Sequence, residues 1–302
     1  MWQPDPAWSP LRGGGGPATV GLWRGREGGA VAIIKRLRRP EPDEAAVLGD
    51  PTHAAYWRRE VEAALAPTVL DGPGLVPSRV LRVEEDDDGA TLWTEEVVAP
   101  PPSTLFVARA LGRFAGARHQ DVRWAARQTL TDRLAFAEAR GGWPTLRRTT
   151  LADTADHLWD RRRHWLGRYA AGPLGRLHGD AVPANFLASR GEDAVAVDWQ
   201  GFGIGPIGTD LGYLALSARE DFDVLFETYV QGVAEEGAVD AEAIGLAATV
   251  MAVYTVFSRA EWALSRVAPG EGALAGKFGH PSVAPHLRAL QRQIPRIESL
   301  LD

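Results

Sequence analysis

Three polar residues in the second half of the chain have the types and spacing that phosphoryl transfer requires. Asp180 and Asn185 lie five positions apart, and Asp198 ends the apolar run 195–197, thirteen residues after Asn185. In this reaction a carboxylate accepts or orients the proton of the attacking hydroxyl, while oxygen ligands hold Mg²⁺ against the β- and γ-phosphates. The catalytic loop of protein kinases has the same Asp-x-x-x-x-Asn spacing. The pattern predicts a magnesium-dependent kinase that phosphorylates a hydroxyl group.

The segment around these residues resembles the aminoglycoside phosphotransferase and choline kinase family. The family signature is His-Gly-Asp-x-x-x-x-Asn, followed by a strand that ends in Asp-Trp. His178 and Gly179 precede the first Asp of the signature here, and Trp199 follows the second. The resemblance covers most of the chain, about residues 10–235, and is clearest over 176–216. It implies a bilobal fold like that of protein kinases, with ATP or GTP as co-substrate and Mg²⁺ as cofactor.

The resemblance also implies a role for each residue of the signature. Asp180 would be the catalytic base, Asn185 a magnesium ligand and Asp198 the main magnesium ligand. His178 would support the loop rather than take part in the chemistry.

The chain departs from protein kinases at three points. Gly179 stands where protein kinases carry the Arg of His-Arg-Asp, and Trp199 follows Asp198 where they carry Phe. Only the short stretch 201–209 separates Asp198 from Asp210, so a long activation segment does not fit. We expect Asp210 to cap the helix that follows it rather than to bind a metal.

The N-terminal lobe supplies an independent indication through Lys35, one of two lysines in the chain. Lys35 ends the apolar stretch 30–35, where kinases place the lysine that contacts the α- and β-phosphates. Its partner is expected on the next helix, and Glu60 is the candidate, with Glu44 and Glu62 as rivals.

Further nucleotide contacts are expected from a glycine run and from the connection between the lobes. The run 13–16, with Gly21 after it, would let backbone amides approach the phosphates, and Gly16 ends that run. It does not match Gly-x-Gly-x-x-Gly, and a flexible terminal run is an alternative. Glu95 and Val97 fall where kinases form the adenine-binding hinge, an assignment that rests on position alone.

These residues must be positioned by a small β-rich lobe and a larger helical lobe, an α+β fold. Strands are expected at 18–24, 30–35, 78–83 and 90–97, with a Gly28-Gly29 hairpin, a solvated acidic turn at 84–88 and a helix at 53–66 stopped by Pro67. From residue 103 the pattern is mostly helical, interrupted by a strand-rich patch at 175–200. We therefore divide the chain into a nucleotide-binding lobe, 1–97, and a catalytic and acceptor-binding lobe, 98–302.

The composition narrows the class of protein. A net charge of −6 and a pI near 5.7 argue against a nucleic-acid partner. The absence of cysteine excludes disulfides and thiolate metal sites, and it fits a cytoplasmic protein. We recognise no signal peptide, and no run approaches the roughly 20 apolar residues that span a bilayer, so no membrane partner is expected.

The acceptor is the part that the sequence determines least. We expect a small molecule with a hydroxyl group, such as an antibiotic, an amino sugar or a natural-product intermediate. In this family, acidic residues of the helical lobe commonly hold cationic acceptors. The candidates here are Glu220, Asp221, Asp223, Glu227 and Glu261, with Trp262. An exposed position on a solvated helix face would explain each of them equally well.

Two alternatives remain open. The acceptor could be a Ser or Thr of a biosynthetic precursor peptide, which a broad and open cleft would favour. The chain could instead be a nucleotide-binding pseudokinase scaffold, against which the intact Asp180, Asn185 and Asp198 speak. The sequence does not predict the choice between ATP and GTP or the oligomeric state.

Overall fold

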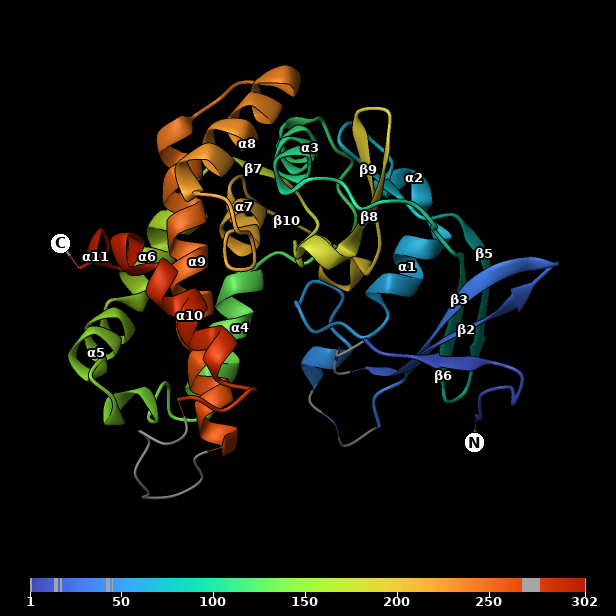
Figure 1. Ribbon diagram of the computed structural model, residues 1–302, viewed down its shortest axis with the longest axis horizontal. Coiled ribbons are helices and arrows are strands. Elements are labelled where there is room, and N and C mark those ends of the chain that lie inside the picture. The colour runs from blue at the N-terminus through green and yellow to red at the C-terminus, as the bar shows by residue number, and fades with distance from the viewer. Residues whose placement is uncertain are drawn as a thin grey trace.

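The N-terminal part is built around one antiparallel sheet of five strands (Figure 1). In spatial order the strands are β1 (Ser9–Leu11), β2 (Thr19–Glu27), β3 (Ala30–Arg38), β6 (Gly89–Glu95) and β5 (Val80–Asp86). This computed structural model describes residues 2–13, 16, 18–41, 44, 46–267 and 278–301. Gly14 and Gly15 of the expected glycine loop, and Lys277, lie outside the described residues.

The hairpin between β2 and β3 turns at Gly28 and Gly29, as predicted. Their φ angles of 56° and 87° lie in the left-handed region that glycine enters without steric cost. β3 continues three residues beyond its predicted end at Lys35, because Arg36 to Arg38 keep pairing with β6.

The helix predicted at 53–66 is shorter in the structure. α1 spans Arg59–Leu65, and the preceding residues form turns. The carbonyl oxygens of Pro51, His53 and Ala54 accept hydrogen bonds from the Arg59 guanidinium, and this cluster occupies the place of a first helical turn. Pro67 does not simply stop the helix, since it opens the short α2, Pro67–Leu70.

The acidic run 84–88 is exposed throughout, as expected, but only its last two residues form the turn. Glu85 and Asp86 belong to β5, and their carboxylates pair with Arg58 and Arg36 at 2.7 Å. The strand reaches further into the run than its charge suggested, because these arginines neutralise it.

The C-terminal part is helical, as predicted. It contains α3 (Thr104–Gly116), α4 (Thr129–Ala139), α5 (Ala152–Asp160), α6 (Arg162–Ala170), α7 (Thr209–Leu214), α8 (Phe222–Glu236), α9 (Ala241–Val267), α10 (Ala284–Arg292) and α11 (Ile294–Glu298). Among the described residues, α9 is the one helix long and apolar enough to cross a membrane. It packs against α4, α6, α7, α8, α10 and α11, and most of its apolar side chains are buried, which is the environment of a core helix.

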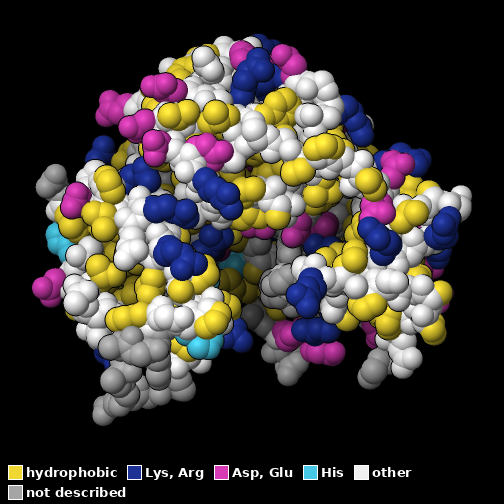
Figure 2. Space-filling model, viewed as in Figure 1, with side chains coloured by type: hydrophobic (Ala, Val, Ile, Leu, Met, Phe, Trp, Pro, Cys, Tyr) yellow, Lys and Arg dark blue, Asp and Glu magenta, His cyan; other side chains and the backbone are white. Residues whose placement is uncertain are grey.

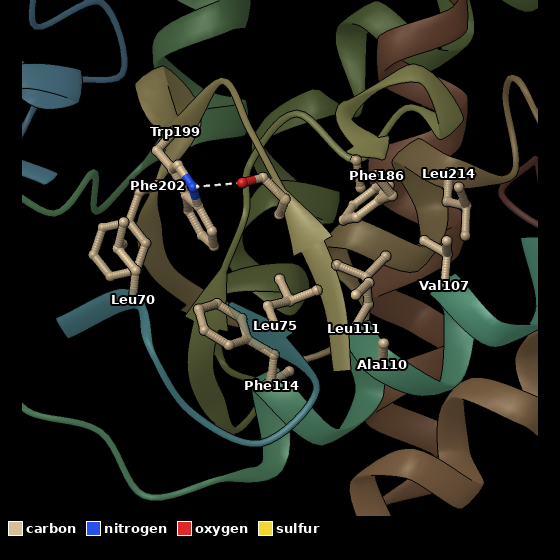
Figure 3. Packing of buried hydrophobic residues seen from close by; sticks show 14 of the residues in the cluster. Leu70, Leu75, Val107, Ala110, Leu111, Phe114, Phe186, Trp199, Phe202 and Leu214 are labelled. Atoms are coloured by element: carbon tan, nitrogen blue, oxygen red, sulfur yellow. Dashed lines mark hydrogen bonds between the residues drawn. The ribbon is translucent and has the colours of Figure 1, made fainter. Parts of the chain in front are cut away.

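Two small sheets lie between the five-stranded sheet and the helices. β4 (Leu75–Pro77) pairs in parallel with β9 (Asp193–Ala196), which pairs with β8 (Phe186–Arg190), and β7 (Leu174–Leu177) pairs with β10 (Gly203–Pro206). Around them the buried side chains of both parts form a continuous core, drawn in Figure 3. Because β4 precedes residue 97 and β9 follows it, the two parts share a sheet, and a domain boundary at 97/98 stays a prediction.

Candidate active site

Asp180 and Asn185 lie in the loop between β7 and β8. The side-chain amide nitrogen of Asn185 donates to the backbone oxygen of Asp180 at 2.9 Å and to its carboxylate Oδ2 at 3.0 Å. These two bonds fix the carboxylate relative to the loop. With the amide in this orientation, its oxygen is left as a free electron-pair donor beside Asp180.

Two buried side chains hold this loop in place. His178 is fully buried, its Nε2 lies 3.0 Å from the Val197 carbonyl oxygen, and its Nδ1 accepts from the Asp180 amide at 3.3 Å. The neutral tautomer with the proton on Nε2 satisfies both contacts. The Asp210 carboxylate accepts from the amides of His178, at 2.6 Å, and Gly179, at 2.9 Å.

The prediction that Asp210 caps a helix was wrong. Gly208 occupies the N-cap position of α7, and Asp210 lies within the first turn with its carboxylate directed at the loop. Burial raises its pKa, although the two amide donors and the charge of Arg133 oppose that shift. Asp210 therefore anchors the loop that carries Asp180.

The backbone just before Asp180 and the backbone just after Asp198 approach each other closely at Gly179 and Gly201. A Cβ on Gly179 would lie 1.8 Å from the Gly201 carbonyl oxygen, and the φ of Gly179 is +78°. A side chain at this position is excluded by both contact and conformation. The glycine that departs from the protein-kinase motif is thus required by this packing.

Asp198 has φ 63° and is the one residue other than glycine with positive φ in the part of the chain that the structure describes. It follows the end of β9, and this turn directs its carboxylate toward β3. Such a conformation costs of order 1–3 kcal/mol and occurs mainly where function requires it. The backbone is therefore strained at the residue that the sequence assigned to the metal.

Lys35 joins the five-stranded sheet to this turn. Its Nζ lies 2.6 Å from Oε2 of Glu60 and 2.8 Å from Oδ1 of Asp198. Burial alone would lower the pKa of Lys35, but the two carboxylates raise it above its usual range. Burial raises the pKa of Glu60, and the ammonium of Lys35 opposes this. Of the three expected candidates, Glu60 is the one that meets Lys35.

A first cavity, of about 330 Å³, lies between the five-stranded sheet and the loops. Its apolar walls come from both parts of the chain, and its polar end holds Lys35, Glu60, Asn185 and Asp198. Glu95 lines it as well, with its carboxylate paired to Arg79 at 3.1 Å, whereas Val97 is half-buried and outside the lining. The size and the mixture of apolar walls with a few charged groups are typical of a small-molecule site.

A second cavity, of about 360 Å³, opens on the other side of Asp198. It is lined by Asp180 and Asp198, by Gln200 and the adjoining glycines, by Ala54 and Ala55, and by one face of α4. Gly16 lines this second cavity, not the first. A Cβ on Gly16 would lie 2.2 Å from Oε1 of Gln200.

The α4 face was missed by the sequence analysis. Thr129, Arg133 and Phe136 line the second cavity, and their steps of four and three residues place them on one side of the helix. That spacing was the only signal in the sequence, since the segment contains no motif.

The acidic candidates for acceptor binding lie elsewhere. The described residues that line the two cavities do not include Glu220, Asp221, Asp223, Glu227, Glu261 or Trp262. Glu261 is buried, and its carboxylate accepts from the amides of Thr145 and Leu146 at 2.9 Å, so it fixes the start of a short helical turn.

The oxygen donors around Asp198 suit Mg²⁺, which takes part of its ligands from phosphates and water. They suit less well a metal ion that needs a full set of protein ligands. The described residues contain no group of three or more His, Cys, Asp or Glu that could enclose an ion. Asn185 and Asp198 offer hard oxygen atoms beside a nucleotide-sized cavity. Mg²⁺ is usually bound by one or two such ligands, with substrate phosphates and water completing its octahedron.

The comparisons with known proteins agree with this geometry. The phosphotransferase enzyme family matches residues 8–243. No curated protein sequence matches the chain. Amicoumacin kinase hAmiN in complex with AMP-PNP, Ca²⁺ and Ami has a similar structure, with a TM-score of 0.60 at 12% identity over 98% of this chain and 89% of that one.

Two further solved structures share the fold. Choline kinase LicA from Streptococcus pneumoniae has a TM-score of 0.57 at 13% identity, covering 97% of this chain and 93% of its own. Aminoglycoside phosphotransferase APH(3'')-Id from Streptomyces rimosus, in complex with ADP and streptomycin, has a TM-score of 0.53 at 18% identity, covering 82% and 94%. The fold is kinase-like, and the chain belongs to the phosphotransferase enzyme family.

Proposed function

We propose that the protein transfers the γ-phosphate of ATP or GTP to a hydroxyl group of a small molecule, with Asp180 as the base. The observation that carries the proposal is the position of Asp198, which lines both cavities and contacts Lys35. A nucleotide in the first cavity would direct its terminal phosphate toward Asp198. An acceptor in the second cavity would meet that phosphate beside Asp180.

Each residue of the site has one task in this proposal. Lys35, oriented by Glu60, binds the α- and β-phosphates of the nucleotide. Glu95 borders the nucleobase at the far end of the first cavity. Asn185 and Asp198 hold Mg²⁺, which supplies charge neutralisation to the transferring phosphate when bound. Asp180 receives the proton of the acceptor hydroxyl, and Asn185 keeps its carboxylate oriented. The neighbours solved with AMP-PNP and ADP support a nucleotide co-substrate.

The second cavity supports a small molecule over a precursor peptide. Its volume of about 360 Å³ is within the usual range for small ligands. The solved neighbours with Ami and streptomycin bind small molecules. The ion pair of Lys35 with Glu60, formed beside the intact loop, supports catalysis over a scaffold role.

The test is release of nucleoside diphosphate from ATP and from GTP, with and without a panel of hydroxyl compounds. Asp180→Asn should reduce acceptor-dependent release by about 10²- to 10⁴-fold, the contribution typical of a general base. Asp153→Asn, a change on α5 away from both cavities, is the matched control and should behave as wild type. Equal rates for wild type and Asp180→Asn on every acceptor would exclude the proposal and favour the scaffold.

A further inference from the structure

The charged lining of the second cavity carries information about the acceptor. Three charged residues line it: Asp180, Asp198 and Arg133. The two carboxylates are occupied in the proposed reaction, one as the base and the other as a metal ligand. Arg133 is thus the charged group that remains available to the acceptor, and no further carboxylate lines the cavity among the described residues.

The Arg133 guanidinium is held in place by a backbone carbonyl oxygen and an aromatic ring. Its Nη2 donates to the Gly179 carbonyl oxygen at 2.9 Å, and its Cζ lies 4.7 Å from the centre of the Tyr213 ring. Arg133 takes part in none of the ion pairs formed among the described residues, although its charge lowers the pKa of the buried Asp210 carboxylate. A guanidinium has five N–H donors, so most of them are free to bind an anionic group in the cavity.

The surroundings strengthen the positive charge. Arg259 lies over the same Tyr213 ring, at 4.4 Å from its centre, and pairs with no described carboxylate. Figure 2 shows a group of Lys and Arg side chains on the helical side of the hollow between the two parts, and others on its opposite rim. The chain has a net charge of −6, so this basic face is a local feature.

We infer that the acceptor is a hydroxyl compound that carries an anionic group, a carboxylate or a phosphate, and that Arg133 binds this group. The inference rests on the proposed function, because the proposed function identifies the second cavity as the acceptor site. A planar guanidinium recognises either anion through paired hydrogen bonds. A cationic acceptor such as an amino sugar or choline would meet a like charge at Arg133 and find no unoccupied carboxylate.

The first test measures recognition of an anion without the natural acceptor. Sulfate is titrated into protein saturated with Mg²⁺ and AMP-PNP, and the NMR signal of the Arg133 side chain, assigned by its loss in Arg133→Gln, is followed. We expect saturable binding at Arg133, weakened at least about tenfold by Arg259→Gln, which removes the neighbouring positive charge. Arg288→Gln, outside both cavities, is the control and should leave the titration unchanged. No shift of the Arg133 signal would overturn the inference.

The second test measures turnover with matched acceptors. The panel pairs each hydroxy acid or phosphate ester with its neutral amide or alcohol and with its amine, for example glucuronate, glucose and glucosamine. We expect the highest kcat/KM in the anionic set, and a KM for the best acceptor that rises about 10- to 100-fold in Arg133→Gln while the KM for nucleotide stays constant. A cationic or neutral best acceptor, or an unchanged acceptor KM, would overturn the inference and leave the phosphotransferase proposal intact. The proposal itself fails only if the rates do not depend on Asp180.

Discussion

The ammonium of Lys35 lies 2.8 Å from Oδ1 of Asp198, a residue 163 positions later in the chain. The same ammonium pairs with Glu60 at 2.6 Å, so one cation joins β3, α1 and the turn after β9. Lys35 and Glu60 are largely buried, Asp198 is partly exposed, and the cation lies between two carboxylates whose charges would otherwise repel each other. In the proposed function, folding and catalysis would therefore depend on the same contact, and a double substitution can separate the two effects.

Lys35→Met is expected to lower both stability and activity. It leaves Glu60 as an unpaired buried carboxylate, which costs about 3–5 kcal/mol in the free energy of unfolding. The added change Glu60→Gln removes that charge and should restore most of the stability, but not phosphate transfer, because the phosphate-binding cation is still missing. Urea unfolding and initial rates on the same samples provide the measurement. Recovery of activity in the double variant would show that Lys35 is purely structural.

Gly179→Ala is expected to abolish transfer by displacing the loop that carries Asp180. The new Cβ would lie 1.8 Å from the Gly201 carbonyl oxygen at a φ of +78°. Gly191→Ala is the matched control, since its φ of +63° is similar and nothing lies within 4 Å of its Cβ. We expect Gly191→Ala to cost about 1–2 kcal/mol in stability with unchanged kcat. Comparable kcat values for the two variants would contradict the close approach of the loops.

The residues that meet at the polar end of the first cavity could be identified from the sequence because their spacing is local and specific. Asp180, Asn185 and Asp198 belong to a recognisable signature, and β3 was evident from its apolar run. The choice among Glu44, Glu60 and Glu62 needed the structure. Glu44 pairs with Arg38 and Glu62 with Arg58, so the rivals serve surface ion pairs.

The acceptor end could not be predicted, because tertiary packing forms it. Arg133 lies in a segment without a motif, and its significance depends on α4 facing Asp180 across a cavity. Glu261 was a reasonable candidate by charge, yet it satisfies backbone amides in the interior. Asp210 was misassigned for the same reason, since helix-start statistics do not reveal a contact with a strand end 32 residues earlier.

Arg59→Met is expected to destabilise the fold strongly and to disturb the second cavity. The Arg59 guanidinium is fully buried and donates to five carbonyl oxygens, including those of Ala54 and Gln200, two residues that line the cavity. Burial lowers its pKa to about 10, so it stays charged at neutral pH. Its removal leaves several buried carbonyls without a donor, at a cost of at least about 3 kcal/mol.

The neighbouring Arg58 provides the control for this variant. Arg58 is partly exposed and pairs with Glu62 and Glu85, so Arg58→Met should cost about 0–1 kcal/mol. Thermal unfolding followed by circular dichroism compares the two. Arg59→Lys should resemble Arg59→Met, because an ammonium cannot reach carbonyls on several sides. Equal melting temperatures for Arg58→Met and Arg59→Met would rule out the buried guanidinium as a structural hub.

Acid is expected to weaken the N-terminal sheet through Asp86 and Glu85. The guanidinium of Arg36 lowers the pKa of Asp86, and that of Arg58 lowers the pKa of Glu85. A carboxyl whose pKa is lower in the folded state stabilises the fold above its unfolded pKa, near 3.8 for Asp and 4.5 for Glu, and this contribution is lost as the pH falls through the folded pKa. Stability should therefore decline below about pH 4.5. Asp86→Asn should be less stable than wild type at pH 7 and converge with it near pH 2, as measured by urea unfolding. A constant difference between the two proteins across that range would mean that the pairing of Asp86 with Arg36 contributes nothing to the fold.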